Sequence, residues 1–137
     1  MAQRPSQTNP EKLRKAGLRP TRQRLALAQL LFARGDRHVT AEGLHEEAVS
    51  AGVPVSLATV YNTMHQFTTA GLLREVTVDG TRTYFDTNIG DHHHFYCPDD
   101  GTLMDIDGAA IAVAGVPAPP HGSKVDRVDV IVRLKRR

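Results

Sequence analysis

Residues 56–71 have the sequence SLATVYNTMHQFTTAG, which predicts an amphipathic helix over residues 57–70. Ser56 is a favoured N-cap residue, and Gly71 ends the helix. The apolar residues recur at helical spacing and predict one buried stripe: Leu57, Val60, Met64 and Phe67. The opposite face is polar, uncharged and rich in short hydrogen-bonding groups: Thr59, Asn62, Thr63 and Gln66. Such groups suit a helix that lies against base edges in the major groove of DNA, although a plain surface helix remains an alternative.

The residues on either side of this helix predict a winged helix-turn-helix. Helices are expected at 11–16, 21–34 and 40–51, and each ends near a glycine. After the helix, two β-rich runs at 73–78 and 81–85 are joined by Asp79-Gly80, the strongest short signal for a hairpin. Arg82 follows this turn and is expected to reach a phosphate or the minor groove. Residues 1–10 are polar, contain two prolines and are expected to form a loose arm.

The second half of the chain predicts a small sheet. Strands are expected at 92–97, at 102–106 and, from strict alternation of apolar residues, along the whole of 124–134. Residues 115–122 carry three prolines and are expected to be irregular. Three strands bury too little core to be stable alone, so pairing with a second copy of the chain is expected. The predicted fold class is α+β, with a DNA-binding domain at 1–86, a hinge at 87–91 and a dimerisation and sensing domain at 92–137.

Composition narrows the class of protein. The chain has 137 residues, 40% hydrophobic residues and a formal net charge of +2. Its first 24 residues contain seven basic residues and one acid, which suits contact with DNA phosphates, although a solvated basic face is the alternative. The single cysteine excludes an internal disulfide and a multi-cysteine zinc site. Without a signal peptide or a long apolar run, a cytoplasmic protein with no membrane partner is expected.

Three consecutive histidines open the strand predicted at 92–97. Because side chains alternate along a strand, His92 and His94 share one face and His93 takes the other. Two imidazoles on one face can bind one metal ion. A ligand cluster beside a DNA-binding module indicates a transcription regulator that responds to a metal or to haem.

Three segments resemble the ferric uptake regulator (Fur) superfamily: GLRPTRQR at 17–24, SLATVYN at 56–62 and HHHFYC at 92–97. The resemblance covers nearly the whole chain. Within the superfamily the chain is most similar to the iron response regulators (Irr) of alphaproteobacteria. Three features carry that similarity: the histidine triplet, the absence of cysteine pairs, and the ending at 125–137 that replaces a C-terminal helix.

The resemblance implies a homodimeric winged-helix regulator that binds a palindromic operator in double-stranded DNA. The helix at 56–70 would enter the major groove, with Thr59, Tyr61 and Asn62 as contacts. Arg19 would help to bind the DNA backbone, and Ser56 and Arg82 complete the predicted DNA-binding set. Regulators of the iron response type act when iron is scarce. They bind haem, and haem then ends their function.

The resemblance also implies a regulatory metal site made of His38, Asp86, His92 and His94. Asp105 is a candidate fifth ligand, because some peroxide-sensing relatives use an aspartate at this place. Imidazoles and carboxylates suit Mn²⁺, Fe²⁺ or Zn²⁺ and do not select one. Such a site would join the two domains and fix the spacing of the two recognition helices in a dimer.

Two further cofactor expectations follow from the cysteine and the histidines. Many superfamily members carry a structural zinc on two Cys-x-x-Cys pairs. Here Cys97 is alone, and Asp100 stands where its partner would be. No structural four-cysteine zinc is therefore expected.

Haem is expected as an effector, with His92, His93, His94 or Cys97 as its ligand. A haem-delivering protein is expected as a partner. His93, the histidine least involved in the metal site, is the best placed of these.

Two other functions compete with this interpretation. A peroxide sensor of the same superfamily would hold Fe²⁺ at the five-ligand site, where peroxide would be the oxidant of a coordinating histidine. A zinc metalloenzyme is the alternative from another class, because three histidines and a carboxylate can hold a catalytic zinc. The DNA-binding module, and the lack of an obvious general base near the triplet, favour a regulator that is not an enzyme.

Overall fold

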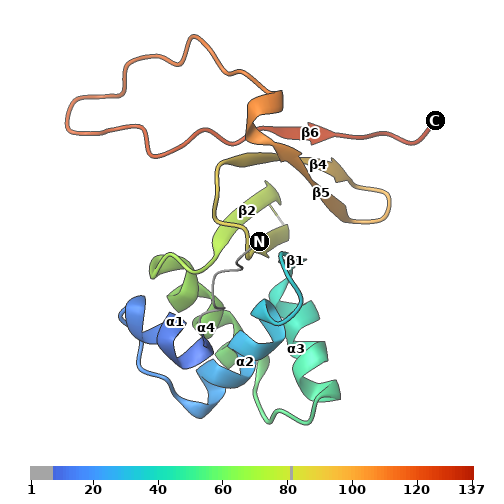
Figure 1. Cartoon of the computed structure of the whole chain (residues 1–137). Coiled ribbons are helices and arrows are strands. Elements are labelled where there is room, and N and C mark those ends of the chain that lie inside the picture. The colour runs from blue at the N-terminus through green and yellow to red at the C-terminus, as the bar shows by residue number, and fades with distance from the viewer. Residues whose placement is uncertain (1–7, 81) are drawn as a thin grey trace, which may run out of the picture. The chain divides into compact units, whose positions relative to one another are not determined.

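The computed structural model describes residues 8–80 and 82–137 (Figure 1). These residues form two compact units, and the boundary lies between Ile89 and Gly90. The helices are α1 (Asn9–Lys15), α2 (Arg22–Phe32), α3 (Ala41–Ser50) and α4 (Leu57–Thr69), with a short 3-10 helix at Gly108–Ala110. The strands are β1 (His38–Val39), β2 (Arg74–Asp79), β3 (Arg82–Asp86), β4 (His92–Cys97), β5 (Thr102–Asp107) and β6 (Ile131–Arg133).

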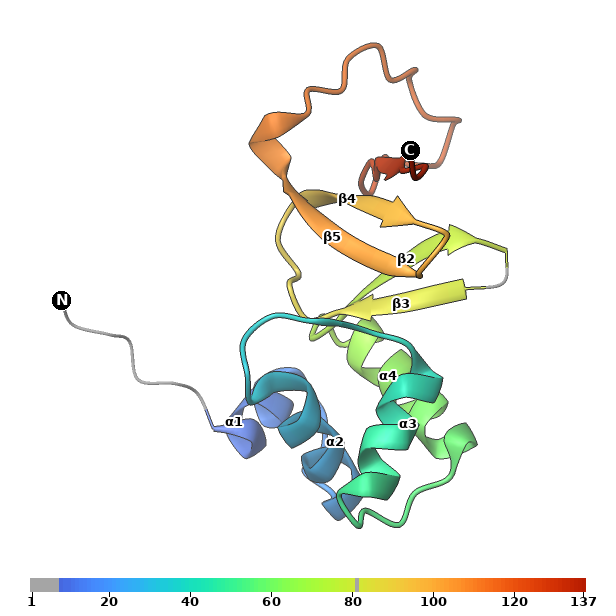
Figure 2. The same cartoon turned by 90° about the vertical axis from the view of Figure 1, so that its right-hand side faces the viewer.

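The four helices of the first unit begin at hydroxyl N-caps. Thr8, Thr21, Thr40 and Ser56 each accept a hydrogen bond from the backbone amide three residues later. The helices gather on one side of the β2–β3 hairpin (Figure 2), and their inward faces form one apolar core. Its largest fully buried side chains include Leu27, Leu44 and Phe67.

The hairpin of the first unit belongs to an antiparallel sheet of order β1-β3-β2. At its turn the backbone N–H of Arg82 donates to Asp79 Oδ1 over 3.0 Å. Strand β1 was not expected from the sequence. It pairs with β3 so that His38 lies directly opposite Asp86, which matters for the candidate metal ligands below.

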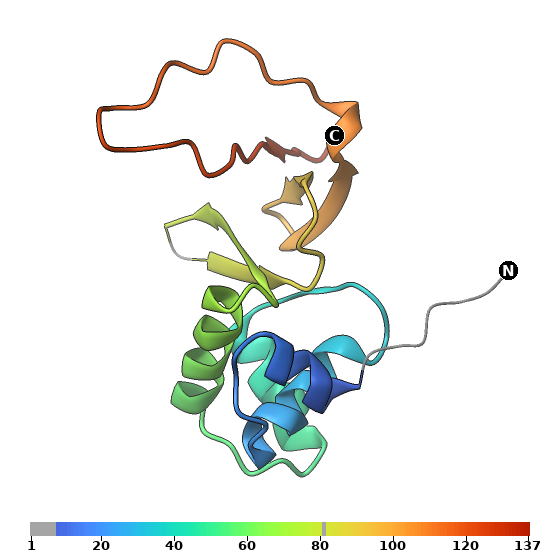
Figure 3. The same cartoon turned by 60° about the vertical axis from the view of Figure 1, so that its left-hand side comes forward.

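The second unit is a sheet of order β5-β4-β6, in which β5 is antiparallel and β6 parallel to β4. The expected strand over 124–134 is wrong in length, because only Ile131–Arg133 forms one. These three residues pair with His94, Phe95 and Tyr96. Alternation predicts which side chains share a face, but a strand also needs a neighbouring strand to pair with. Among the residues that the structure describes, 112–130 have no such neighbour and run as a long loop (Figure 3).

Three other details differ from the sequence-based expectations. Leu57 was expected in the buried stripe but is 37% exposed, because it lies in the first turn of α4. Thr63 was expected on the polar outer face but is buried at 5% exposure. Helix α1 already begins at Asn9, so the end of the expected arm is helical, and residues 1–7 and Thr81 lie outside the described residues. No helix in the described part of the chain is long and apolar enough to cross a bilayer.

Candidate nucleic-acid interface and metal ligands

Helix α4 presents the polar face that was predicted to contact DNA, without the buried Thr63. Asn62 and Gln66 are exposed, while Thr59 and Tyr61 are half-buried. The Ser56 hydroxyl accepts from the Thr59 backbone amide over 3.1 Å and donates to the Thr59 hydroxyl over 3.0 Å. Ser56 therefore acts first as the cap that orients the beginning of α4. Arg19 and Arg82 are both exposed.

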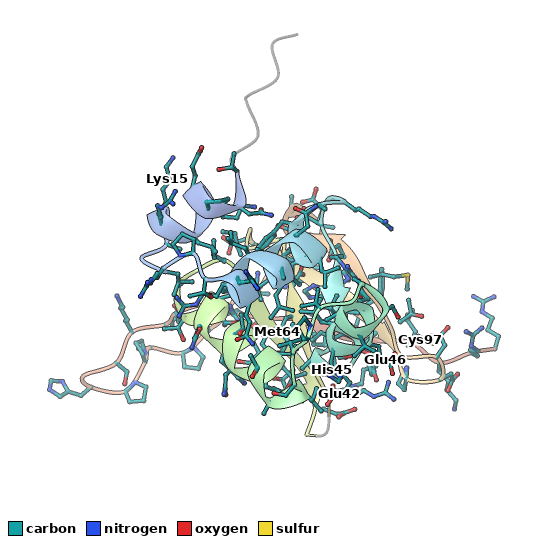
Figure 4. The ribbon with its side chains drawn as sticks, turned by 90° about the horizontal axis from the view of Figure 1, so that it is seen from below. Lys15, Glu42, His45, Glu46, Met64 and Cys97 are labelled. Carbon is teal, nitrogen blue, oxygen red and sulfur yellow. The ribbon has the colours of Figure 1, made fainter. Side chains whose placement is uncertain are left out.

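Tyr61 is oriented by helix α3. Its hydroxyl donates to Glu42 Oε1 over 3.1 Å, and this hydrogen bond raises the pKa of Tyr61 above its ordinary value. Glu42 lies in the first turn of α3, the helix that also carries His45 and Glu46 (Figure 4). The Tyr61 ring stacks on His65, with ring centroids 6.1 Å apart. Tyr61 is therefore positioned from two sides before any nucleic acid binds.

A polar hollow of about 320 Å³ lies between the beginning of α2 and the face of α4. Arg24 spans it: Nε and Nη2 donate to Gln66 Oε1 over 3.2 and 3.0 Å, and Nη1 donates to the Arg19 carbonyl over 2.9 Å. Sequence reasoning missed both Arg24 and Glu42 as members of this surface. Their roles depend on contacts between separate helices, for which periodicity within one helix carries no signal.

Two of the predicted metal ligands meet within the first unit. His38 Nε2 lies 3.2 Å from Asp86 Oδ2, and the Asp86 side chain is fully buried. The other carboxylate oxygen, Oδ1, accepts the backbone N–H of Asn88 over 2.9 Å. The strand pairing of β1 with β3 fixes this geometry, so His38 is not an isolated loop histidine.

The strand that carries His38 is tied to the helices by Arg37. The Arg37 guanidinium donates to both carboxylate oxygens of Glu47 on α3, over 2.8 and 2.6 Å, and to the carbonyl of Leu30 on α2 over 3.0 Å. The hydrogen bonds to Glu47 raise the pKa of Arg37. The backbone of Arg37 also exchanges hydrogen bonds with Thr87, over 2.8 and 3.1 Å. This network was not expected from the sequence.

Three more predicted ligands meet within the second unit. His92 and His94 share one face of β4, as predicted, and both are buried. Their Nε2 atoms each lie 3.3 Å from Asp105 Oδ1, which projects from the neighbouring strand β5. His92 Nδ1 lies 2.6 Å from the Gly90 carbonyl. A proton on Nδ1 leaves the Nε2 lone pair facing Asp105, where it can bind a metal.

The separations within both groups fit a metal ion. Two donors about 2.1 Å from a tetrahedral ion lie about 3.4 Å apart. The His38–Asp86 separation and the two distances to Asp105, 3.2 and 3.3 Å, match this value. All three ligand atoms in the second unit lie within 4.8 Å of one another. The donor chemistry of imidazole and carboxylate therefore fits Mn²⁺, Fe²⁺ or Zn²⁺ in each group.

His93 points away from the Asp105 group and contacts Val130, the residue just before β6. The backbone N–H of Val130 donates to His93 Nδ1 over 3.1 Å. A neutral imidazole that accepts at Nδ1 carries its proton on Nε2. In this arrangement His93 offers no lone pair to iron, so the described conformation does not fit haem ligation at His93.

Cys97, another of the four predicted haem ligands, is buried at 7% exposure where β4 enters its turn. Asp100 lies in that turn and accepts from the Thr102 backbone amide over 3.0 Å. Hydrogen bonds from the side chain and backbone of Thr102 lower the pKa of Asp100, with a further contribution from the charge of Arg136, which pairs with it. Asp100 therefore pairs the C-terminal tail with the turn after β4.

Comparisons with known proteins agree on one family. Residues 15–131 match the ferric uptake regulator family. The ferric uptake regulation protein of Pseudomonas aeruginosa is 38% identical over 100 residues, which cover 72% of this chain and 75% of that protein. The transcriptional regulator FurA of Mycobacterium bovis is 33% identical over 123 residues, which cover 88% and 82%. The structure of the Pseudomonas aeruginosa ferric uptake regulator with manganese matches with a TM-score of 0.73 at 28% identity, covering 96% of this chain and 99% of that one.

Proposed function

This chain belongs to the ferric uptake regulator family, and we propose from that premise that it is a cytoplasmic, DNA-binding transcriptional regulator of iron and haem homeostasis. We further propose that it acts as a homodimer under iron limitation, and that it responds to a divalent metal and to haem. The observation that carries the proposal is that each unit brings imidazole and carboxylate groups together at metal-ligand spacing.

DNA binding is proposed for α4 and the residues around it. The support is an uncharged polar face on α4, whose first turn is oriented by the N-cap Ser56. Glu42 of α3 and Arg24 of α2 orient Tyr61 and Gln66 on the same face. Thr59, Tyr61 and Asn62 are proposed to contact base edges. Arg19 and Arg82 are proposed to contact the backbone of a palindromic operator.

The metal site is proposed to combine both groups of ligands on one ion: His38, Asp86, His92, His94 and Asp105. The residues at 87–91 would then act as the hinge between a DNA-binding domain at 1–86 and a sensing domain at 92–137. Mn²⁺, Fe²⁺ and Zn²⁺ are the candidate ions, and the ion would supply the bond that joins the domains. Arg37 supports the proposal because it orients the strand that carries His38.

Haem is proposed as an effector that acts on the second unit and is supplied by a haem-delivering protein. The proposal that haem is an effector rests on the resemblance to iron response regulators. In the described conformation the three histidines contact the Gly90 carbonyl, the Val130 amide and Asp105 instead. We expect haemin to weaken DNA binding, and we expect His93→Ala to blunt that response more than it weakens metal-dependent binding. Soret absorbance and gel shift on both proteins test this. If haemin weakens DNA binding equally in the wild-type protein and in His93→Ala, Cys97 becomes the proposed haem ligand.

Dimerisation is proposed for the second unit. Its three-stranded sheet leaves Phe95 and Met104 36 and 41% exposed, and Val128, in the loop before β6, is 38% exposed. This is apolar surface that a second copy would cover. We expect truncation after about residue 120 to leave a monomer, because this removes β6. Light scattering that shows a full-length monomer at micromolar concentration would contradict the proposal.

One experiment tests the core of the proposed function. Full-length protein is first stripped of metal with a chelator. Gel shifts on a family-type palindromic duplex are then run without metal, with Mn²⁺ and with Mn²⁺ plus haemin. We expect a specific shift with Mn²⁺ that weakens when the chelator or haemin is added. Equal binding to the palindrome and to a scrambled duplex would refute the proposal.

A peroxide sensor is kept as a second candidate because Asp105 faces both His92 and His94. Its carboxylate would complete a five-ligand iron site of the kind in which a coordinating histidine becomes oxidised. Exposure of the Fe²⁺-loaded protein to hydrogen peroxide, followed by mass spectrometry, separates the two candidates. Addition of one oxygen atom to a ligand histidine would favour the peroxide sensor.

A further inference from the structure

We propose that Gln66 determines DNA sequence specificity, and that Arg24 sets which end of the Gln66 carboxamide faces the DNA. The inference rests on the proposed DNA-binding function and adds two residues to it. Gln66 is exposed and lies one helical turn beyond Asn62 on α4. Residues four apart share a helix face, so Gln66 extends the row of base contacts.

The contacts of Arg24 fix the orientation of this amide. A guanidinium group carries only hydrogen-bond donors, whereas a carboxamide has an acceptor oxygen on one branch and a donor nitrogen on the other. Arg24 donates twice to Gln66, over 3.2 and 3.0 Å, so the amide must present Oε1 to the guanidinium. The Nε2 branch therefore lies on the side away from Arg24.

Arg24 is itself oriented at both ends. Its third contact is to the backbone carbonyl of Arg19 over 2.9 Å, and its backbone N–H donates to Thr21, the N-cap of α2. The carbonyl of Arg19 can only accept, so rotation of the guanidinium would lose this bond as well. Arg24 thus connects the loop before α2 to α4 and prevents the Gln66 amide from flipping.

A donor at this place has a defined chemical preference. Amide N–H groups recognise acceptors on base edges, which are N7 and O6 of guanine, N7 of adenine and O4 of thymine. They do not pair with the N4 amino group of cytosine, which only donates. Gln66 also lines the hollow of about 320 Å³ that it shares with Asn62, Thr59 and Arg24. A base edge at the rim of that hollow would meet Nε2.

The test is a selection from DNA duplexes with a randomised central segment, using full-length protein loaded with Mn²⁺. The enriched motif is then measured by fluorescence anisotropy against duplexes that carry single base-pair changes. We expect Gln66→Ala to lower discrimination about five- to tenfold at one base pair of each half-site and at no other. Gln66→Glu keeps a partner for Arg24 but replaces the donor by an acceptor, so its preference should move toward cytosine at that base pair.

Arg24 is tested by the same readout. Arg24→Ala releases the amide, and we expect broader base preference at that same base pair. Arg22→Ala is the matched control, because Arg22 is an exposed arginine in the same turn of α2. It removes one positive charge and should weaken all duplexes about equally. Gln29→Ala, on an exposed face of α2, controls for loss of a glutamine.

The outcomes separate this inference from the proposed function. If the wild-type protein enriches no motif, the proposed DNA-binding function fails and the inference falls with it. If a motif is enriched but Gln66→Ala leaves preference unchanged at every base pair, the inference is overturned and the function stands. If Gln66→Ala weakens binding to all duplexes equally and also lowers the melting temperature, the contact with Arg24 only stabilises the fold. This result also overturns the inference. Unchanged preference in Arg24→Ala would overturn the orienting role of Arg24.

Discussion

Replacing Arg37 by alanine is expected to lower the stability of the first unit and to weaken metal binding at the proposed ligand His38. The change removes two contacts to Glu47 and one to the Leu30 carbonyl. Hydrogen bonds to charged groups contribute about 1.5–3 kcal/mol, whereas exposed ion pairs contribute about 0.2–1 kcal/mol. The side chains of Arg37 and Glu47 are 29 and 38% exposed, which is between a buried and a fully exposed pair. We therefore expect the free energy of unfolding to fall by about 1–2 kcal/mol.

Thermal and urea unfolding measure this loss. For a unit of this size, we expect the melting temperature to fall by about 5–10 °C. A double-mutant cycle with Glu47→Ala isolates the pair, and its coupling energy should be about 1 kcal/mol. The control is Arg34→Ala. Arg34 is an exposed arginine in the turn just after α2, and its replacement should change stability by less than about 0.5 kcal/mol.

The same variant tests whether Arg37 orients His38. A loosened β1 strand should weaken metal affinity by about fivefold, which corresponds to about 1 kcal/mol. Competition with a chromophoric chelator measures this affinity at a temperature where the variant stays folded. A coupling energy near zero, or metal affinity equal to that of the wild-type protein, would refute the reasoning.

Asn62→Ala should cost about 1–3 kcal/mol of specific DNA binding, and unchanged operator affinity at matched salt would remove Asn62 from the interface. Double replacement of His92 and His94 by alanine should strongly lower metal affinity while the dimer persists, and unchanged metal stoichiometry would place the site elsewhere. The pKa of Asp100 is lowered in the folded chain, so its contribution to stability is complete above the ordinary carboxyl pKa. It is lost as the pH falls through the lowered value, and NMR titration of Asp100 should show the release of Arg136 in that range.

The helices of the first unit could be predicted because their signals are local. Hydroxyl caps, helical spacing and the Asp79-Gly80 turn each lie within a few residues, and the predicted elements formed within about two residues of their expected ends. Strand β1 could not be predicted, because two residues carry no period. It exists only because β3 offers an edge opposite His38.

The candidate site was predictable in part for the same reason. Alternation along one strand placed His92 and His94 on one face, and the structure confirms it. The contacts of Arg24 with Gln66, of Arg37 with Glu47 and of His93 with Val130 join residues 42, 10 and 37 positions apart. No pattern within a single element encodes such pairs, so only the folded chain reveals them.

The bond between Val130 and His93 also bears on the order in which the second unit folds. It closes a loop across 37 positions, and closing a flexible loop of that length costs about 3 kcal/mol of chain entropy. The β4–β5 hairpin needs a turn of only a few residues, so it forms before β6 can join it. Strand β6, with three paired residues, is then the last part of the sheet to form and the first to open. A newly made chain therefore exposes one edge of β4 until its own β6 pairs there. Strand β6 of a second chain can pair with that edge instead.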